Sequence, residues 1–254
     1  MNLLEGNHIS KNYSRGDSSV KALIDVSFHL ADGEILGIVG ESGSGKSTLL
    51  RQISGLEAPD EGEMLLNGRL LSPKRTREEY STMQMIFQDA VGSFHPRRTI
   101  RSSIRETVHN LRGRSVEPDL ESLCAIVGLD PVLADRYPRN LSGGQCQRFA
   151  IARALAVDPK ILLCDEVTSA LDVSSQAQVL KLISDICRER HMSAIFVSHD
   201  LAVVSCICDR VMVMYQGRVV EEGKARDVID HPQDEYSRRL ISSVLEIKKE
   251  EANS

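Results

Sequence analysis

The sequence predicts an α/β fold, in which short buried strands of an open sheet alternate with helices. Three apolar runs with a β-branched bias support this prediction. Polar residues that could belong to a functional site follow each of them. The runs are Ile35–Val39, Ile161–Cys164 and Ala194–Val197. Ligands of open α/β sheets bind at the carboxyl ends of such strands, so the residues that follow these runs are the first functional candidates.

Composition narrows the class of protein. The chain has 254 residues, 41% of them hydrophobic and 26% charged, which suits one large globular domain or a core with a subdomain. A net charge of −5 argues against a nucleic-acid partner held by bulk charge. No apolar run approaches the roughly 18 residues of a membrane span, and the first seven residues are too polar for a signal peptide.

Cysteine spacing predicts reduced thiols in a cytosolic protein. The six cysteines are scattered and form no C-x-x-C pair, so we expect them to be mostly buried. Cys206 and Cys208 are the closest pair, and we predict that both are inert core thiols.

The stretch Gly40–Ser47, called the phosphate loop below, fits the pattern G-x-x-x-x-G-K-[ST] between a strand and a helix. Glycines let successive N–H groups point at an anion, and the helix adds its positive N-terminal end. Lys46 suits the β- and γ-phosphates, and the Ser47 hydroxyl suits Mg²⁺. We expect a nucleoside triphosphate to bind through Gly40, Ser42, Gly43, Gly45, Lys46, Ser47 and Thr48.

Strands are expected on both sides of this loop. The residues before about position 35 partly alternate, and Gly62–Leu71 is typical of a hairpin that turns at Asn67-Gly68. Tyr13 stands alone near the start, and by itself it is best interpreted as a half-buried packing aromatic.

A helical insertion follows the next strand, Met83–Phe87. Helical spacing runs from Thr99 to Leu111 and from Asp119 to Val127, so the insertion lies between two core strands. Gln88 ends the strand, where it could merely cap it or could reach a metal or water at the phosphate site.

The run Leu141–Gln145 opens another helix, with Ser142 as its expected N-cap. Two interpretations stay open from the residues alone. One is a capped helix with a flexible entry, and the other is a second anion site made of a serine hydroxyl, glycine N–H groups and a helix N-terminus.

Burying carboxylates at the end of a strand costs free energy unless they take part in catalysis or binding or pair with an opposite charge. Asp165 and Glu166 follow Ile161–Cys164, and we expect Asp165 to coordinate Mg²⁺ indirectly and Glu166 to orient and deprotonate an attacking water. His199 follows the strand Ala194–Val197 and could bond γ-phosphate oxygens.

In this order the motifs resemble those of the ATP-binding cassette (ABC) ATPases over nearly the whole chain. The sequence LSGGQ at Leu141–Gln145 is that family's signature letter for letter, and ILLCDE at Ile161–Glu166 resembles its second nucleotide motif. Ser169–Asp172 resembles the D-loop, Gln88 the Q-loop and His199 the switch histidine. Tyr13 falls where the family stacks an aromatic ring on adenine.

The resemblance implies a P-loop NTPase (RecA-like) core with an antiparallel β subdomain and an inserted α-helical subdomain. The expected boundaries are 1–88 and 153–225 for the core with its β subdomain, 89–152 for the helical subdomain, and 226–254 for a C-terminal helical segment and tail. It further implies catalytic roles for Glu166, His199 and Gln88, nucleotide contacts from Tyr13, Ser142, Gly143, Gly144, Gln145 and Asp172, and magnesium ligation by Ser47, Gln88 and Asp165.

Within the family, the chain resembles the dipeptide, oligopeptide and nickel importers. Phe87–Asp89 with Ser93–Arg97, Glu166–Val173, and His231-Pro232 with Tyr236–Leu240 are similar to motifs of that branch. Ala90 replaces the usual proline, Phe94-His95 replace Leu-Asn, and Cys146 follows LSGGQ where arginine, glutamine or leucine is common.

The resemblance implies an ATPase subunit on the cytoplasmic face of a membrane, using ATP and Mg²⁺. Its expected partners are transmembrane permease subunits, a second identical or paralogous ATPase subunit and, indirectly, an extracytoplasmic substrate-binding protein. One alternative is a soluble ABC ATPase of DNA repair or translation, although the chain has no long coiled-coil insertion. Another is a P-loop kinase or GTPase, which would leave LSGGQ unexplained and lacks an N-K-x-D motif here.

Overall fold

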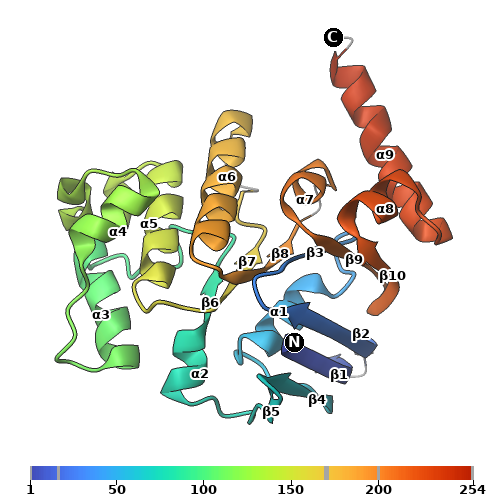
Figure 1. The fold of residues 1–254 in the computed structure, drawn as a ribbon, viewed down its shortest axis with the longest axis horizontal. Coiled ribbons are helices and arrows are strands. Elements are labelled where there is room, and N and C mark those ends of the chain that lie inside the picture. The colour runs from blue at the N-terminus through green and yellow to red at the C-terminus, as the bar shows by residue number, and fades with distance from the viewer. Residues whose placement is uncertain (1, 16–17, 169–171, 199–200, 253–254) are drawn as a thin grey trace. The chain divides into compact units, whose positions relative to one another are not determined.

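A computed structural model describes residues 2–15, 18–168, 172–198 and 201–252 and confirms the mixed α/β fold (Figure 1). The chain divides into two compact units. The first unit comprises Met1–Pro73 and Ser193–Ser254, and the second comprises Lys74–Met192. The subdomain boundaries expected from the resemblance stay a prediction.

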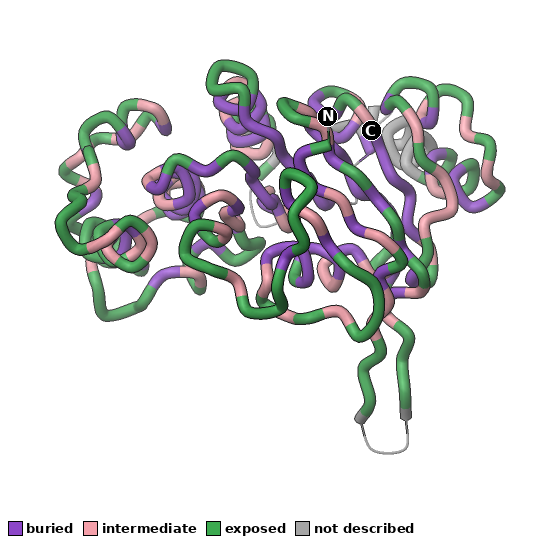
Figure 2. The backbone as a smooth tube through the Cα atoms, turned by 60° about the horizontal axis from the view of Figure 1, so that its bottom comes forward, coloured by how far each residue is buried: buried purple, intermediate pink, exposed green. Residues whose placement is uncertain are grey.

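The first unit contains an antiparallel sheet with the strand order β2-β1-β4-β5. Its strands are β1 (Asn2–Arg15), β2 (Ser18–Ala31), β4 (Glu61–Leu66) and β5 (Arg69–Leu70). The predicted turn between β4 and β5 is confirmed, since Asn67 and Gly68 have φ of 52° and 71°, as a type I′ turn requires. Figure 2 shows that β1 and β2 become exposed toward the end of their hairpin.

Four further strands of the first unit lie in the order β10-β9-β3-β8 of a mostly parallel sheet. These are β3 (Ile35–Val39), β8 (Ser193–Val197), β9 (Arg210–Tyr215) and β10 (Arg218–Lys224). β3 pairs in parallel with β8 and β9, while β10 returns antiparallel along β9. β3 and β8 are buried over their whole length, which explains why both are apolar apart from Ser193 at the start of β8.

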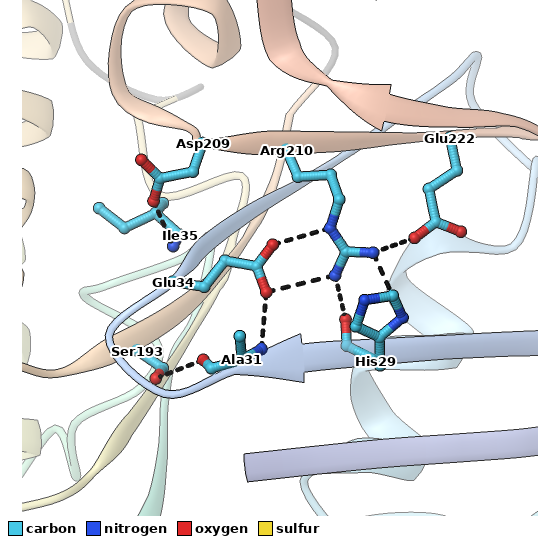
Figure 3. Close-up of polar contacts among 8 residues, drawn as sticks. All are labelled: His29, Ala31, Glu34, Ile35, Ser193, Asp209, Arg210 and Glu222. Atoms are coloured by element: carbon cyan, nitrogen blue, oxygen red, sulfur yellow. Dashed lines mark hydrogen bonds and ion pairs between the residues drawn. The ribbon is translucent and has the colours of Figure 1, made fainter. Parts of the chain in front are cut away.

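One arginine joins these strands to the antiparallel sheet (Figure 3). Arg210 on β9 donates 2.7 and 3.2 Å hydrogen bonds to the carboxylate of Glu34, and it also pairs with Glu222 on β10 and the backbone oxygen of His29 on β2. The Glu34 carboxylate in turn accepts a 2.6 Å bond from the N–H of Ala31. A cation shared by two carboxylates and a carbonyl therefore fixes the turn from β2 into β3, directly before the phosphate loop.

Four helices belong to the first unit, counting only its described residues. They are α1 (Lys46–Ile53), α7 (Leu201–Ile207), α8 (Ala225–Asp230) and α9 (Glu235–Ala252). Gly55 follows α1 with φ of 77°, and its N–H donates to the backbone oxygen of Gln52, as is typical of a glycine just past the end of a helix.

In the second unit, β6 (Met83–Ile86) pairs in parallel with β7 (Ile161–Asp165). The helices are α2 (Arg77–Thr82), α3 (Ile100–Arg112), α4 (Leu120–Val127), α5 (Gly143–Leu155) and α6 (Val173–Glu189), with short 3-10 turns at Pro131–Asp135 and Pro138–Asn140. α5 contacts α3 and α4, which confirms a helical region between two strands.

Five of the six cysteines are buried, as expected, but Cys206 is exposed, so its prediction as a core thiol is wrong. The helical spacing of α7 turns Cys206 away from the face that buries Val204 and Cys208. Burial raises the pKa of Cys208 and raises that of Cys187 to about 12, which keeps both thiols protonated and unreactive.

Within the described ranges, no helix has the length and apolar character needed to cross a bilayer.

Candidate functional site

Glycine is required at two points of the phosphate loop, which connects β3 to α1. At Gly40, with φ of 150°, an added Cβ would lie 2.2 Å from the backbone oxygen of Met214. At Gly45, with φ of 107°, it would lie 2.5 Å from the backbone oxygen of Ala22. At Gly43, also at positive φ, a Cβ would meet nothing within 4 Å, so this part of the loop faces open space.

Lys46 is 5% exposed, and its side chain turns back onto the loop. Its Nζ donates 2.8 Å bonds to the backbone oxygens of Gly40 and Glu41, with Ser44 Oγ at 3.4 Å. The ammonium group is thus held by oxygens of the loop at the N-terminus of α1. A buried cation at a helix N-terminus favours binding of an anion.

The N-terminus of α1 differs from those of α2 to α6. A side chain caps each of those helices, namely Thr76, Thr99, Asp119, Ser142 and Asp172. The N-cap of α1 is Gly45, which has no side-chain acceptor for the first amide groups of the helix. A helix that begins at glycine leaves its N-terminal end accessible to an anion such as phosphate.

Three contacts support the phosphate loop from the C-terminal part of the first unit, and none of them was predicted. The N–H of Gly217 donates to the backbone oxygen of Ser44 at 3.0 Å, and the backbone of Met214 packs against Gly40. The N–H of Glu41 donates to the hydroxyl of Tyr236 at 2.9 Å. The signal for Tyr236 in the sequence is the C-terminal motif that contains it, Tyr236–Leu240.

Tyr13 lies on β1 and is 38% exposed, so part of its ring is open for stacking. Its hydroxyl donates to the carboxylate of Glu57, and Lys11 Nζ lies 5.8 Å from the ring centroid. Burial and the Glu57 carboxylate raise the pKa of Tyr13, while the Thr48 hydroxyl of α1 opposes that rise. Tyr13 therefore lies beside the helix that follows the phosphate loop.

In the second unit, the structure brings Gln88 and Glu166 together. They follow the paired strands β6 and β7, and Gln88 Nε2 donates to Glu166 Oε2 at 3.1 Å. Glu166 has φ of 45°, a conformation that is uncommon for residues other than glycine and that is found at functional sites. Asp165, the last residue of β7, is half-buried.

The turn Leu141–Gln145, called the signature turn below, is a capped helix start. Ser142 Oγ accepts the N–H of Gln145 at 3.2 Å, and Gln145 Oε1 accepts the N–H of Ser142 at 3.0 Å. This reciprocal pair is a capping box, which confirms Ser142 as the N-cap. Ser142 and Gly143 are exposed, and a Cβ at Gly144 would meet nothing within 4 Å, so the turn offers an open face.

Arg153 of α5 connects the helix of the signature turn to the segment that follows Gln88, a contact that the sequence did not predict. Its guanidinium donates to the backbone oxygen of Ser93 at 2.6 Å and to Ser93 Oγ at 3.1 Å. The same group lies 4.4 Å from the ring centroid of Phe94. Burial lowers the pKa of Arg153 to about 10.

The remaining predicted site residues are placed in part. Asp172 is exposed and caps α6, since its carboxylate accepts the N–H and the hydroxyl of Ser175 at 3.0 and 2.7 Å. His199 and residues 169–171 of the predicted D-loop lie outside the described residues. Across the part of the chain that is described, no three His, Cys, Asp or Glu side chains gather into a metal site.

Comparisons with known proteins give consistent results. A family model described as "ABC transporter" matches residues 23–169. The oligopeptide transport ATP-binding protein OppF of Haemophilus influenzae is 45% identical over 95% of this chain and 78% of its own length. OppF of Escherichia coli is 47% identical over 89% of this chain and 70% of its own length.

Among solved structures, the dimeric post-hydrolysis state of the cassette MJ0796 bound to ADP and Pi is similar, with a TM-score of 0.78 and 29% identity. The alignment covers 88% of this chain and 99% of that one.

Proposed function

The chain belongs to the ABC transporter family, and from this premise we propose that it is the ATPase subunit of an importer for oligopeptides. The observation that carries the proposal is the phosphate loop, in which a buried lysine lies at the start of a helix whose N-cap is glycine. The high identity to oligopeptide transport proteins over most of the chain supports the substrate class and favours it over nickel. It also disfavours a soluble ABC ATPase of DNA repair or translation.

The phosphate loop holds the triphosphate of ATP through its backbone N–H groups and Lys46. Lys46 keeps its bond to the Gly40 carbonyl and exchanges the Glu41 carbonyl for a phosphate oxygen. Ser42, Gly43 and Thr48 complete the contacts on the open side, and Tyr13 stacks on the adenine.

Magnesium fits the chemistry of the available donors, because Ser47, Asp165 and Gln88 offer hydroxyl, carboxylate and amide oxygens. When bound with the nucleotide, Mg²⁺ supplies charge neutralisation at the phosphate oxygens. We assign these three residues as its ligands, with Asp165 acting indirectly.

Glu166 is the general base for hydrolysis. Its carboxylate orients the attacking water and accepts a proton from it. The 3.1 Å bond from Gln88 fixes one oxygen of that carboxylate, so Gln88 acts as its positioning partner. We assign His199 to the γ-phosphate on the strength of the resemblance.

Two chains act together, head to tail. The signature turn of one chain completes the γ-phosphate contacts at the phosphate loop of the other. The residues that contribute these contacts are Ser142, Gly143, Gly144 and Gln145, and Asp172 adds to the nucleotide site. The exposed face of that turn and the dimeric solved relatives support this arrangement. The second chain is either a copy or a paralogue.

The segment 88–105 transmits the conformational change driven by ATP binding and hydrolysis to transmembrane permease subunits. This role places the chain at the cytoplasmic face of the membrane. A substrate-binding protein outside the membrane delivers the peptide to those subunits. This assignment follows the names of the relatives, which are transport ATP-binding proteins.

Uptake by cells that lack the gene tests the substrate. We expect radiolabelled tripeptide uptake to be lost and then restored by the wild-type chain but not by Glu166→Gln. Nickel uptake, measured in parallel, should be unchanged. Loss of nickel uptake with normal peptide uptake would overturn the proposed substrate class, and normal uptake of both would overturn the importer role.

A further inference from the structure

One peptide group of the phosphate loop connects two side chains that lie far apart in sequence. The carbonyl of Gly40 accepts a 2.8 Å bond from Lys46 Nζ, and the N–H of Glu41 donates a 2.9 Å bond to the Tyr236 hydroxyl. These two backbone groups belong to the same planar peptide unit, so they cannot turn independently. A rotation of this plane that moved one group would move the other.

Tyr236 is well placed to hold this plane. It is 5% exposed and stacks on Tyr215 with the ring centroids 4.1 Å apart. Burial is the largest cause of the raised pKa of Tyr236, so its hydroxyl stays neutral and can accept the N–H of Glu41. The acceptor is therefore rigid and protonated over the physiological pH range.

The start of α9 is itself anchored to β10. The two carboxylate oxygens of Glu221 accept the N–H groups of Gln233 and Asp234 at 2.8 and 3.1 Å. Asp234 Oδ1 then accepts the N–H of Tyr236 at 2.8 Å. A continuous series of hydrogen bonds therefore leads from β10 through the first turn of α9 to the phosphate loop.

We propose that Tyr236 is a positioning residue for ATP binding, which acts by fixing the Gly40–Glu41 peptide and thereby the place of the Lys46 ammonium. The proposal rests on the role of Lys46 in binding phosphate given above. It assigns the first turn of the C-terminal helix to the nucleotide site. Because the Lys46 side chain is already held in place, it loses less conformational entropy when ATP binds.

Calorimetric titration with Mg-ATP tests this on the full chain. We expect Tyr236→Phe, which keeps the ring stack, to raise the Kd for ATP about three- to tenfold, the range for one neutral hydrogen bond. The kcat at saturating ATP should change less than about twofold, since the residue acts on ground-state binding. The matched control is Tyr215→Phe, which removes a hydroxyl from the stacked partner and should leave the Kd unchanged.

A double-mutant cycle separates positioning from a general structural effect. In a Lys46→Ala background, Tyr236→Phe should change the Kd less than about twofold, because its target is gone. The proposal is overturned if Tyr236→Phe raises the Kd for ATP as much in the Lys46→Ala background as in the wild type. It is also overturned if Tyr236→Phe alone leaves the Kd unchanged, or if Tyr215→Phe raises the Kd as much as Tyr236→Phe does.

Two further results keep the test decisive. If Tyr236→Phe does not fold, Glu221→Ala releases the same turn from its other end and should raise the Kd about two- to threefold, and no rise would overturn the proposal. If Lys46→Ala leaves ATP binding intact, the assignment of the phosphate loop itself fails. If Lys46→Ala weakens ATP binding as expected and Tyr236→Phe does not, the positioning role of Tyr236 is rejected while the assignment of the phosphate loop stands.

Discussion

The phosphate loop and the signature turn both place glycines at the start of a helix, but they are held in different ways. Residues from distant parts of the sequence support the phosphate loop, among them Gly217 and Tyr236, and its Lys46 is buried. The signature turn is held by its own capping box between Ser142 and Gln145. Its leading residues are exposed.

This difference separates a site that one chain can preorganise from a surface that needs a partner. The phosphate loop supplies a cation, curved backbone and a helix end, which together suit a triphosphate. The signature turn supplies a helix end and a hydroxyl but contains no cationic residue. It can add contacts to an anion that is already held, and it is poorly suited to hold one alone.

Glu166→Gln gives the largest expected effect and tests whether the two regions meet on one nucleotide. Loss of the base should lower ATP hydrolysis by roughly 10² or more, while Mg-ATP binding survives. Trapped ATP should then shift the chain from monomer to dimer, measured by light scattering. Glu189→Gln, at an exposed glutamate of α6, is the control and should behave as wild type.

Lys46→Ala removes the cation that distinguishes the phosphate loop from the signature turn. Loss of a charged hydrogen-bonding group should weaken ATP binding by about 10- to 100-fold, measured by calorimetry. Lys181→Ala, at an exposed lysine, should leave the affinity unchanged. Normal ATP affinity in Lys46→Ala would remove the basis of the comparison.

Ser142→Arg in the Glu166→Gln background tests the open face of the signature turn. A bulky cation there should block the approach of the partner chain and weaken the ATP-driven dimer by about tenfold or more. Light scattering measures this, and Ser115→Arg at another exposed serine is the control. Dimers that survive Ser142→Arg would show that the turn is a capped helix and nothing more.

Gln145→Ala gives the smallest effect and tests the statement that the signature turn is held by its own cap. Removing half of the capping box should lower the free energy of unfolding by about 1 kcal/mol in urea titrations. Ser115→Ala should stay within about 0.5 kcal/mol of wild type. An equal stability of Gln145→Ala and wild type would mean that packing, and not the cap, fixes the turn.

Local features of the fold could be predicted because short sequence patterns determine them. Examples are the glycines of the phosphate loop, the Ser142 cap and the Asn67-Gly68 turn. The helix α2 is a local feature that the sequence analysis does not predict. Thr76 and Glu79 nevertheless form a capping box there, a signal that the sequence did carry.

Contacts between distant residues could not be predicted in the same way. Tyr236 meets Glu41 across 195 positions, and Gln88 meets Glu166 across 78. Such pairs depend on how whole elements pack, and neither residue of a pair indicates its partner by spacing. The exposure of Cys206 has the same cause, because the packing of α7 decides which face is buried.

The contact of Arg153 with Ser93 and Phe94 has a consequence for chimeric proteins. If the segment 88–105 contacts the permease as proposed above, exchanging residues 89–98 for those of a relative should redirect the chain to another permease. A donor segment with the usual leucine at position 94 would keep the Ser93 carbonyl but leave the half-buried guanidinium of Arg153 against an aliphatic group instead of a ring. The transferable module is therefore the segment together with α5.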